Sequence, residues 1–271
     1  MANPEYVFDE TREHAEHERL RAIEAVFDPA TKTRLEAVGL SPGWQCLEVG
    51  AGGGSIMRWL AERVGSGGRV VAVETNPRFL EGANRSNTEV MTADIRAVDL
   101  GADHFDLIHG RYVLLHVPDY RTALQRMVRL LKPGGWLVLE EPDFSAAQPV
   151  HGTAEACRAV QKVNRAIQKM YEQRGIDHAM GLRLPGTLHG LGIDDFRVDH
   201  EAPIARGQSG MARMMRMSAE QLRDKYIETG EANPEDVNAY CAFAEDSSTW
   251  AIYYATIAVT AQCHKGQTGV V

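Results

Sequence analysis

The stretch from residue 44 to residue 55, WQCLEVGAGGGS, decides the fold of this chain of 271 residues. Residues 44–49 are mostly apolar and predict a buried strand, the glycine-rich run 50–54 predicts a tight turn, and a helix is expected to begin near Ser55. Glycine lets a ligand approach the backbone, and the first N–H groups of a helix have no helical partner. The stretch therefore predicts a nucleotide-binding turn between a strand and a helix.

Predicted strands and helices alternate beyond this turn. Residues 56–64 share an apolar helical face, and RVVAVE at 69–74 is an uninterrupted run typical of a strand covered on both faces in a parallel sheet. The remaining expected elements are a helix opened by Asn76 and Pro77, strands at 90–92, 105–108 and 136–140, a helix at 120–131, and a turn at Pro133, Gly134 and Gly135. This alternation with short loops predicts an α/β fold with a doubly wound, Rossmann-like sheet.

Further segments flank this core on both sides. Residues 1–40 predict N-terminal helices, the first over 9–27 and the second with Asp28 as its N-cap and Pro29 at its first position. Residues 41–145 are the predicted cofactor-binding core, and residues 146–271 supply helical cap elements and the last two strands of the sheet. In that last part we expect helices at 153–172, 184–191, 211–229 and 234–245, and strands at 196–206 and 250–263, the last with a helix as the alternative.

Composition limits the partners. The formal net charge of -8 disfavours nucleic acid, because affinity for a phosphate backbone rests on clustered Lys and Arg. The four cysteines have no C-x-x-C spacing and the ten histidines no H-E-x-x-H arrangement, so no metal site is predicted. The longest apolar stretch, residues 250–261, is shorter than the roughly 20 residues of a membrane helix, and the N-terminus lacks a signal-peptide pattern. We expect a cytoplasmic protein with a small-molecule partner, no membrane contact and an open oligomeric state, a homodimer being one option.

The glycine turn fits one of two known fingerprints better. The dinucleotide pattern G-x-G-x-x-G or A would place Ser55 in its last position, which is an imperfect match. What stands here is acid-x-Gly-x-Gly-x-Gly, formed by Glu48, Gly50, Gly52 and Gly54. This pattern resembles the first motif of class I S-adenosylmethionine-dependent methyltransferases.

The resemblance continues in order over residues 40–145. Glu74 ends the second predicted strand, where the family's acid receives both ribose hydroxyls, and Asp94-Ile95 matches the pair that contacts adenine. FDLIHGRYVLLHVPDY at 105–120 resembles the family's fourth-strand motif, and LKPGGWLVLEE at 131–141 resembles its fifth. The overall pattern is similar to small-molecule methyltransferases of ubiquinone and menaquinone biosynthesis, a type that also occurs in bacterial secondary metabolism.

The resemblance implies a seven-stranded sheet and a set of cofactor-binding positions. The residues expected to contact S-adenosylmethionine are Tyr6, Glu48, Gly50, Gly52, Gly54, Glu74, Asn76, Asp94, Ile95, His109 and Arg111. Two of these also have a structural interpretation. Asp94 can cap the turn that follows it, and Glu48 can accept backbone hydrogen bonds within its strand instead of facing the cofactor.

Three residues are candidates for proton removal from a substrate. His116 follows the fourth predicted strand, near where the methyl group would lie, with a structural role as the alternative. Glu141 and Asp143 follow the fifth strand with Glu140; solvated loop carboxylates are the alternative, and binding an amine or a metal is a further option. The methionines between 211 and 217 could line a substrate pocket or serve as ordinary packing.

The sequence thus predicts an enzyme, a methyltransferase that uses S-adenosylmethionine to methylate oxygen, nitrogen or carbon of a small, largely apolar metabolite by in-line displacement. One alternative is a nicotinamide-dependent oxidoreductase, which would share the fold and the ribose acid; no Tyr-x-x-x-Lys pair is present to support it. The second alternative is a non-catalytic cofactor-binding protein. An intact glycine motif disfavours that alternative without removing it.

Overall fold

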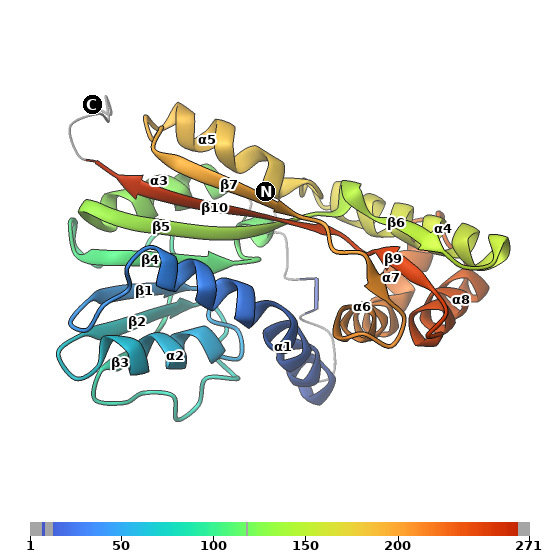
Figure 1. Ribbon diagram of the computed structural model, residues 1–271, viewed down its shortest axis with the longest axis horizontal. Coiled ribbons are helices and arrows are strands. Elements are labelled where there is room, and N and C mark those ends of the chain that lie inside the picture. Colours follow the sequence, from blue (N-terminus) through green and yellow to red (C-terminus); the bar gives the residue numbers. More distant parts are fainter. Residues whose placement is uncertain (1–6, 9–12, 118, 265–271) are drawn as a thin grey trace. The chain divides into compact units, whose positions relative to one another are not determined.

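The computed structural model describes residues 7–8, 13–117 and 119–264 and contains a seven-stranded sheet (Figure 1). The strand order is β3-β2-β1-β4-β5-β10-β7. Its strands are β1 (Gln45–Val49), β2 (Arg69–Glu74), β3 (Thr88–Thr92), β4 (Phe105–Arg111), β5 (Leu131–Asp143), β7 (Phe196–Glu201) and β10 (Ala255–Cys263).

The sheet is mostly parallel and has one strand of opposite direction beyond β5. Strands β3, β2, β1, β4 and β5 pair in parallel, with Val49 opposite both Val73 and Gly110. Strand β10 runs against β4 and β5 (Figure 1). Strand β1 lies between β2 and β4, so the chain winds to one side of β1 first and to the other side afterwards. The carboxyl ends of these three parallel strands therefore meet at one edge, where ligands bind in doubly wound sheets. The predicted α/β fold and seven-stranded sheet are confirmed.

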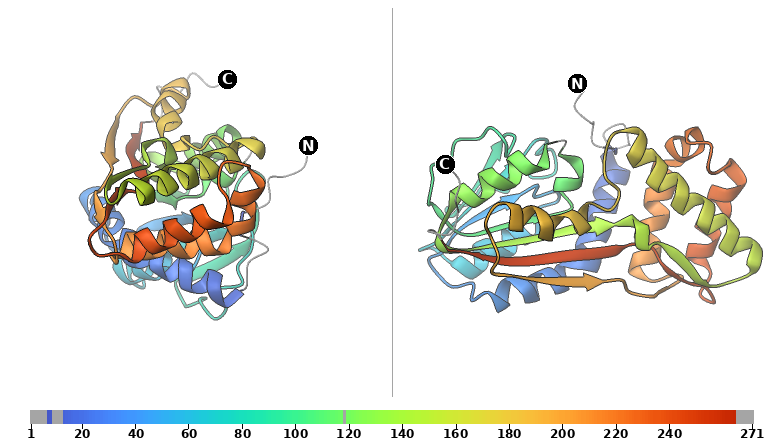
Figure 2. Two further views of the ribbon diagram at one scale, coloured as in Figure 1. Left: turned by 90° about the vertical axis from the view of Figure 1, so that its right-hand side faces the viewer. Right: turned by 90° about the horizontal axis from the view of Figure 1, so that it is seen from above.

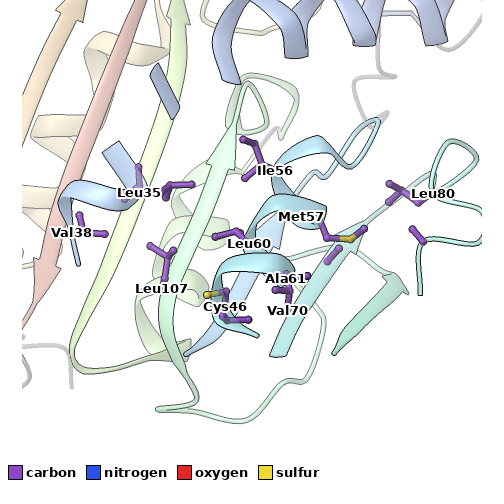
Figure 3. Close-up of a cluster of buried hydrophobic side chains, with 14 residues drawn as sticks. Leu35, Val38, Cys46, Ile56, Met57, Leu60, Ala61, Val70, Leu80 and Leu107 are labelled. Atoms are coloured by element: carbon purple, nitrogen blue, oxygen red, sulfur yellow. The ribbon is translucent and has the colours of Figure 1, made fainter. Parts of the chain in front are cut away.

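Helices cover both faces of these parallel strands. Helix α2 (Ser55–Val64) and helix α3 (Tyr120–Leu130) lie on opposite faces (Figures 1 and 2). The apolar face of α2 packs on β1 and β2, and Figure 3 shows Leu60 close to Leu107 of β4 and Cys46 of β1. These three side chains are fully buried, so apolar burial fixes the glycine turn between β1 and α2 at the sheet edge.

The chain divides into two compact units. The sheet unit comprises Phe27–Glu141, Leu182–Asp199 and Ala258–Val271, and the helical unit comprises Met1–Val26, Pro142–Gly181 and His200–Ile257. The sheet unit also contains α5 (Leu184–Gly190) and the 3₁₀ turn η1 (Leu114–His116). Helix α1 (Glu13–Ala37) begins in the helical unit and ends in the sheet unit, and the 3₁₀ turn η3 (Met180–Arg183) spans the boundary at residue 181.

The helical unit has its own small sheet and helix pair. Its helices are α4 (Ala154–Gln173), α6 (Gly210–Gln221), α7 (Arg223–Glu228) and α8 (Pro234–Glu245). Its antiparallel sheet has the strand order β6 (Gln148–His151), β9 (Trp250–Ile252) and β8 (Ala205–Arg206). The 3₁₀ turn η2 (Phe144–Ala146) precedes β6 in the chain. Helices α4 and α8 pack together, and Lys162 Nζ lies 2.9 Å from Asp236 Oδ1. The predicted division of the chain at residues 40 and 145 stays a prediction.

Two predicted helix boundaries were wrong. Helix α1 runs without a break and contains Pro29, and the Asp28 carboxylate accepts hydrogen bonds from Ser55 and Arg111 instead of capping a new helix. No helix begins at Asn76. Residues 76–87 form separate turns instead. Gly82 has a φ of +69° there, which is incompatible with a continuing helix.

Strand boundaries also differ from the prediction. The expected turn at Pro133 and Gly134 lies within β5, where the register with β4 shifts between Phe105 and Leu107, so a bulge accommodates the two residues. The expected strand at 196–206 forms β7 in one sheet and β8 in another. The final segment, for which strand and helix were both open, forms strands β9 and β10.

Candidate functional site

The turn after β1 has a backbone that requires glycine. Gly50, Gly52 and Gly54 have φ values of +69°, +55° and +83°, a region that other residues rarely adopt. A Cβ on Gly50 would lie 2.3 Å from Cγ2 of Val113. The acid-x-Gly-x-Gly-x-Gly spacing therefore encodes both a left-handed backbone and a close approach, and the turn cannot be reproduced by other small residues.

Glu74 ends β2 and bonds directly to the glycine turn. Its Oε2 accepts a hydrogen bond from Gly52 N at 3.3 Å, and its Oε1 accepts one from Asn76 N at 3.1 Å. The Glu74 side chain at the end of β2 is only partly buried. Its carboxylate oxygens therefore have lone pairs that can accept further hydrogen bonds. Three of the predicted cofactor positions, Gly52, Glu74 and Asn76, are thus hydrogen-bonded neighbours.

The next acid follows β3 at the same sheet edge. Thr92 is in register with Glu74, and Asp94 lies two residues beyond it. The Asp94 carboxylate accepts hydrogen bonds from Arg96 Nε at 2.9 Å and from Arg96 N at 2.8 Å, and the Arg96 guanidinium holds the pKa of Asp94 below its usual value. Ile95 is buried. Asp94 therefore has a local turn role, and its predicted contact with adenine stays a prediction.

A chain of buried charges joins the ends of β1, β4 and β5. His109 Nδ1 lies 2.7 Å from Glu48 Oε2, and His109 Nε2 lies 3.4 Å from Glu140 Oε1. Arg34 of α1 completes the chain, with its Nη1 3.2 Å from Glu140 Oε2. Burial by itself lowers the pKa of His109, but the two carboxylates outweigh it and raise that pKa to about 9. The two carboxylates thus favour the protonated form of His109.

Arg111 connects the end of β4 to α1. Its Nη2 donates to Asp28 Oδ1 at 2.9 Å, and its Nη1 donates to Thr31 Oγ1 at 2.8 Å. The following residue, Tyr112, has a φ of +58°, a costly conformation for a residue with a side chain. The fully buried ring of His109 and the mostly buried guanidinium of Arg111 are both bonded to protein groups; their predicted cofactor contacts stay predictions.

Glu141 binds the backbone of the turn that carries His116. Its Oε1 accepts from Val113 N at 3.0 Å and Leu114 N at 2.7 Å, and its Oε2 accepts from Leu115 N at 3.2 Å. Burial raises the pKa of Glu141 to about 7, although these three donors act in the opposite direction. Both carboxylate oxygens are thus engaged in holding η1, and His116 is the last residue of that turn.

The remaining predicted site residues belong to the helical unit or lie outside the described residues. The Asp143 carboxylate accepts from Ser145 N at 2.9 Å and from the Ser145 hydroxyl. Met214 is buried, with its Sδ 4.0 Å from the Tyr254 hydroxyl. Tyr6, predicted to contact the cofactor, is not among the described residues.

Sequence reasoning missed the contribution of α1 to this network. Arg34 and Asp28 are partners of Glu140 and Arg111, which lie 106 and 83 residues away. Both charged residues are buried on α1, where each stands beside a buried apolar neighbour, Phe27 or Leu35. Their partners cannot be identified without the sheet order.

Two kinds of feature are absent from the described residues. No group of three or more His, Cys, Asp or Glu side chains there could hold a metal ion. No helix formed by those residues is long and apolar enough to cross a bilayer.

Comparison with known proteins assigns the stretch around the glycine turn. Residues 47–139 match a family model described as a methyltransferase domain. The match begins inside β1 and ends inside β5, so it contains the glycine turn, Glu74, Asp94 and His109.

Curated proteins are similar over part of the chain. The chain is 31% identical over 115 residues to the ubiquinone/menaquinone biosynthesis C-methyltransferase UbiE of Ectopseudomonas mendocina, covering 40% of this chain and 45% of that protein. It is 30% identical over 174 residues to methyltransferase str3 of Strobilurus tenacellus, covering 64% of this chain and 61% of that protein. The chain therefore spans about half the length of the curated relatives it matches.

Solved structures share the fold over most of the chain. Phosphoethanolamine N-methyltransferase 2 of Haemonchus contortus, in complex with phosphomonomethylethanolamine and S-adenosylhomocysteine, superposes with a TM-score of 0.63. It covers 98% of this chain and 61% of that one, at 14% identity. At this identity the likeness shows the fold alone.

Proposed function

Because residues 47–139 are a methyltransferase domain of the class I S-adenosylmethionine-dependent type, we propose that the chain transfers a methyl group from S-adenosylmethionine to a small, largely apolar molecule. The observation that carries this proposal is the glycine turn with the Glu74 carboxylate hydrogen-bonded to it. A turn of left-handed glycines leaves room for a ligand next to the backbone, and the carboxylate supplies acceptors for ligand hydroxyls.

The residues at this edge fit the proposed cofactor. Gly50, Gly52 and Gly54 keep this turn free of side chains, and Cβ atoms on Gly50 and Gly54 would collide with Val113 and Leu80. Glu74 would receive the ribose hydroxyls, and Asp94 would receive the adenine amino group. Each carboxylate oxygen of Glu74 accepts from a different backbone N–H, Oε2 from Gly52 and Oε1 from Asn76. Since each oxygen has a second lone pair, Glu74 could bind the ribose hydroxyls while it stays bonded to the turn.

When bound, S-adenosylmethionine supplies a methyl group that the sulfonium already activates for in-line displacement. The chain then has to align the acceptor with that methyl group and exclude water. Good alignment can contribute roughly 7 to 11 kcal/mol to lowering the barrier. The chemical demand on side chains is small unless the acceptor is a hydroxyl group, which must lose a proton.

We assign different roles to the three predicted acid–base residues. His116 is the proposed base for a hydroxyl acceptor, because it ends η1 and is partly exposed. Glu141 is proposed to hold that turn in place, since both of its oxygens accept backbone hydrogen bonds. Asp143 is kept as a candidate substrate contact at the end of β5.

The acceptor class follows from charge and from the relatives. A formal net charge of -8 disfavours a phosphate backbone, so a metabolite is proposed in place of nucleic acid, in a cytoplasmic setting. The relative from Ectopseudomonas mendocina is named for quinone biosynthesis, which supports an apolar acceptor.

Methyl transfer is tested with the full chain and S-adenosylmethionine carrying a tritiated methyl group. We expect label to move into an apolar fraction of a metabolite pool, and S-adenosylhomocysteine to bind in calorimetry. Tight binding of a nicotinamide dinucleotide without binding of S-adenosylhomocysteine would favour the oxidoreductase alternative. Binding of S-adenosylhomocysteine without label transfer into any pool would favour the non-catalytic alternative, and faster transfer to tRNA or protein would overturn the acceptor class.

A further inference from the structure

We propose that His109 is a positioning residue for the glycine turn: as an imidazolium ion at neutral pH it clamps Glu48 to Glu140 and so fixes the end of β1. This inference rests on the proposed function, because its effect is read through the cofactor that the turn would hold. His109 itself is not proposed to touch the cofactor. The ring acts through Glu48, which lies two residues before Gly50 in the chain.

The geometry fits two N–H donors on the ring. Both ring nitrogens face carboxylate oxygens, Nδ1 at 2.7 Å from Glu48 and Nε2 at 3.4 Å from Glu140. A neutral imidazole has one N–H and one bare nitrogen, so one ionised carboxylate would then face a lone pair. The His109 side chain has no exposed surface, so bulk solvent does not supply the missing donor.

The charges next to the ring favour the same state. Two buried carboxylates face it, Glu48 on β1 and Glu140 on β5, and Arg34 of α1 bonds the other oxygen of Glu140. Arg111 on β4 is paired with Asp28 of α1, which also pairs with Lys32. A protonated His109 places one positive charge between the two carboxylates, which offsets the cost of burying them.

The clamp acts on the strand that leads into the turn. Glu48 is 3% exposed, and the residue two positions later, Gly50, donates its N–H to Val73 O at 2.9 Å. Gly50 has no freedom on its other side, because Val113 lies where a Cβ would be. If Glu48 lost its partner, its carboxylate would have to move toward water, and the end of β1 would move with it.

The protonation state is tested in the unmodified protein by nuclear magnetic resonance of ¹⁵N-labelled histidine. We expect both ring nitrogens of His109 to show imidazolium shifts at pH 7.5 and to titrate with a midpoint near 9. A midpoint for His109 at or below the ordinary histidine value of 6.5 would overturn the proposal, and this measurement needs neither a variant nor a ligand.

The positioning role is tested by calorimetry with S-adenosylhomocysteine. At pH 7.5 we expect His109→Gln to bind about tenfold more weakly than the wild type, and His104→Gln to bind equally well. The wild-type advantage over His109→Gln should shrink toward one as pH rises through about 9, because the wild type then loses the same proton. Comparing the two proteins at each pH cancels the titration of the ligand's own amino group.

The outcomes separate this inference from the proposed function. A wild-type protein that does not bind S-adenosylhomocysteine at pH 7.5 counts against the proposed function, while the resonance titration still decides the charge state of His109. Equal affinity of wild type and His109→Gln at every pH would overturn the positioning role while leaving the function intact. If His109→Gln does not fold, Glu140→Gln replaces it, since it removes the other carboxylate from the clamp and should lower the His109 midpoint.

Discussion

The two compact units of this chain arrange their buried polar groups differently. In the sheet unit, Glu48, His109 and Glu140 form a buried chain of hydrogen bonds across three strands. The helical unit buries an ion pair within a single helix, Arg19 with Glu16, and an aromatic cluster in which Phe144 stacks on Tyr171 at 5.3 Å and lies 5.1 Å from Tyr254. Buried charges fix geometry at a high energetic cost, whereas aromatic side chains supply apolar contact area. The difference suggests that the sheet unit is built to position a polar cofactor and the helical unit to accommodate an apolar molecule.

The largest expected effect concerns the glycine turn. Gly50→Ala should lower affinity for S-adenosylhomocysteine by about a hundredfold or more and the free energy of unfolding by about 2 to 4 kcal/mol, because the new Cβ both strains the backbone and meets Val113. Gly82→Ala is a matched control, since Gly82 has the same φ of +69° and nothing within 4 Å of the added Cβ. It should cost about 1 kcal/mol and leave affinity unchanged. Equal losses in the two variants would show that backbone strain alone explains the requirement for glycine.

The pH dependence of stability tests whether the buried network around His109 in the sheet unit is charged. The pKa of His109 is raised in the folded protein to about 9 from an ordinary value of 6.5. Its contribution to folding is therefore complete below pH 6.5 and is lost as pH rises through about 9. The free energy of unfolding in urea should fall by about 3 kcal/mol over that window, and His109→Gln should show a flatter profile. A wild-type profile as flat as that of the variant would contradict a charged network.

Glu141 provides a smaller effect of the same kind. Glu141→Gln replaces an acceptor oxygen by an amide group that would face one of the backbone donors of residues 113–115, so it should cost about 2 to 3 kcal/mol. Glu89→Gln, at an exposed ion pair with Arg69, is the control and should cost less than about 1 kcal/mol. The measurement is urea unfolding of both variants at one pH. A similar cost in both would mean that the buried carboxylate does not hold η1.

These effects also explain which features the sequence could reveal. The glycine turn was predictable because its requirement for left-handed backbone is local, and the strands of the parallel sheet were predictable from buried apolar runs. The role of Glu141 was not predictable, because position alone suggests a loop carboxylate, whereas the structure buries it against backbone N–H groups 26 to 28 residues earlier. The partners of Asp28, Ser55 and Arg111, were likewise not predictable, because they lie 27 and 83 residues away in the sequence.

The contacts of the network itself were beyond sequence reasoning for a different reason. Arg34, Glu48, His109 and Glu140 come from four elements, and their proximity follows only once the order β1, β4, β5 is known. The family resemblance identified His109 as a cofactor position from its motif. The fully buried ring between two carboxylates suggests instead that its influence is transmitted through Glu48. Position in a motif and bonding in the fold are separate kinds of information.

The smallest effect is expected in the helical unit, where removing a polar group should cost nothing. Among the described residues, the hydroxyl of Tyr240 is buried and has no hydrogen-bond partner, and the Tyr240 ring lies 6.1 Å from that of Tyr253. An unmet buried hydroxyl is unfavourable, so Tyr240→Phe should leave the free energy of unfolding unchanged or raise it by up to about 1 kcal/mol. Ser218→Ala is the control, because that hydroxyl donates to Met214 O at 3.1 Å and its loss should destabilise by about 1 kcal/mol. Urea unfolding of both variants decides the matter: if Tyr240→Phe is destabilised as much as Ser218→Ala, the Tyr240 hydroxyl has a partner in solution and stabilises the helical unit as the buried polar groups stabilise the sheet unit.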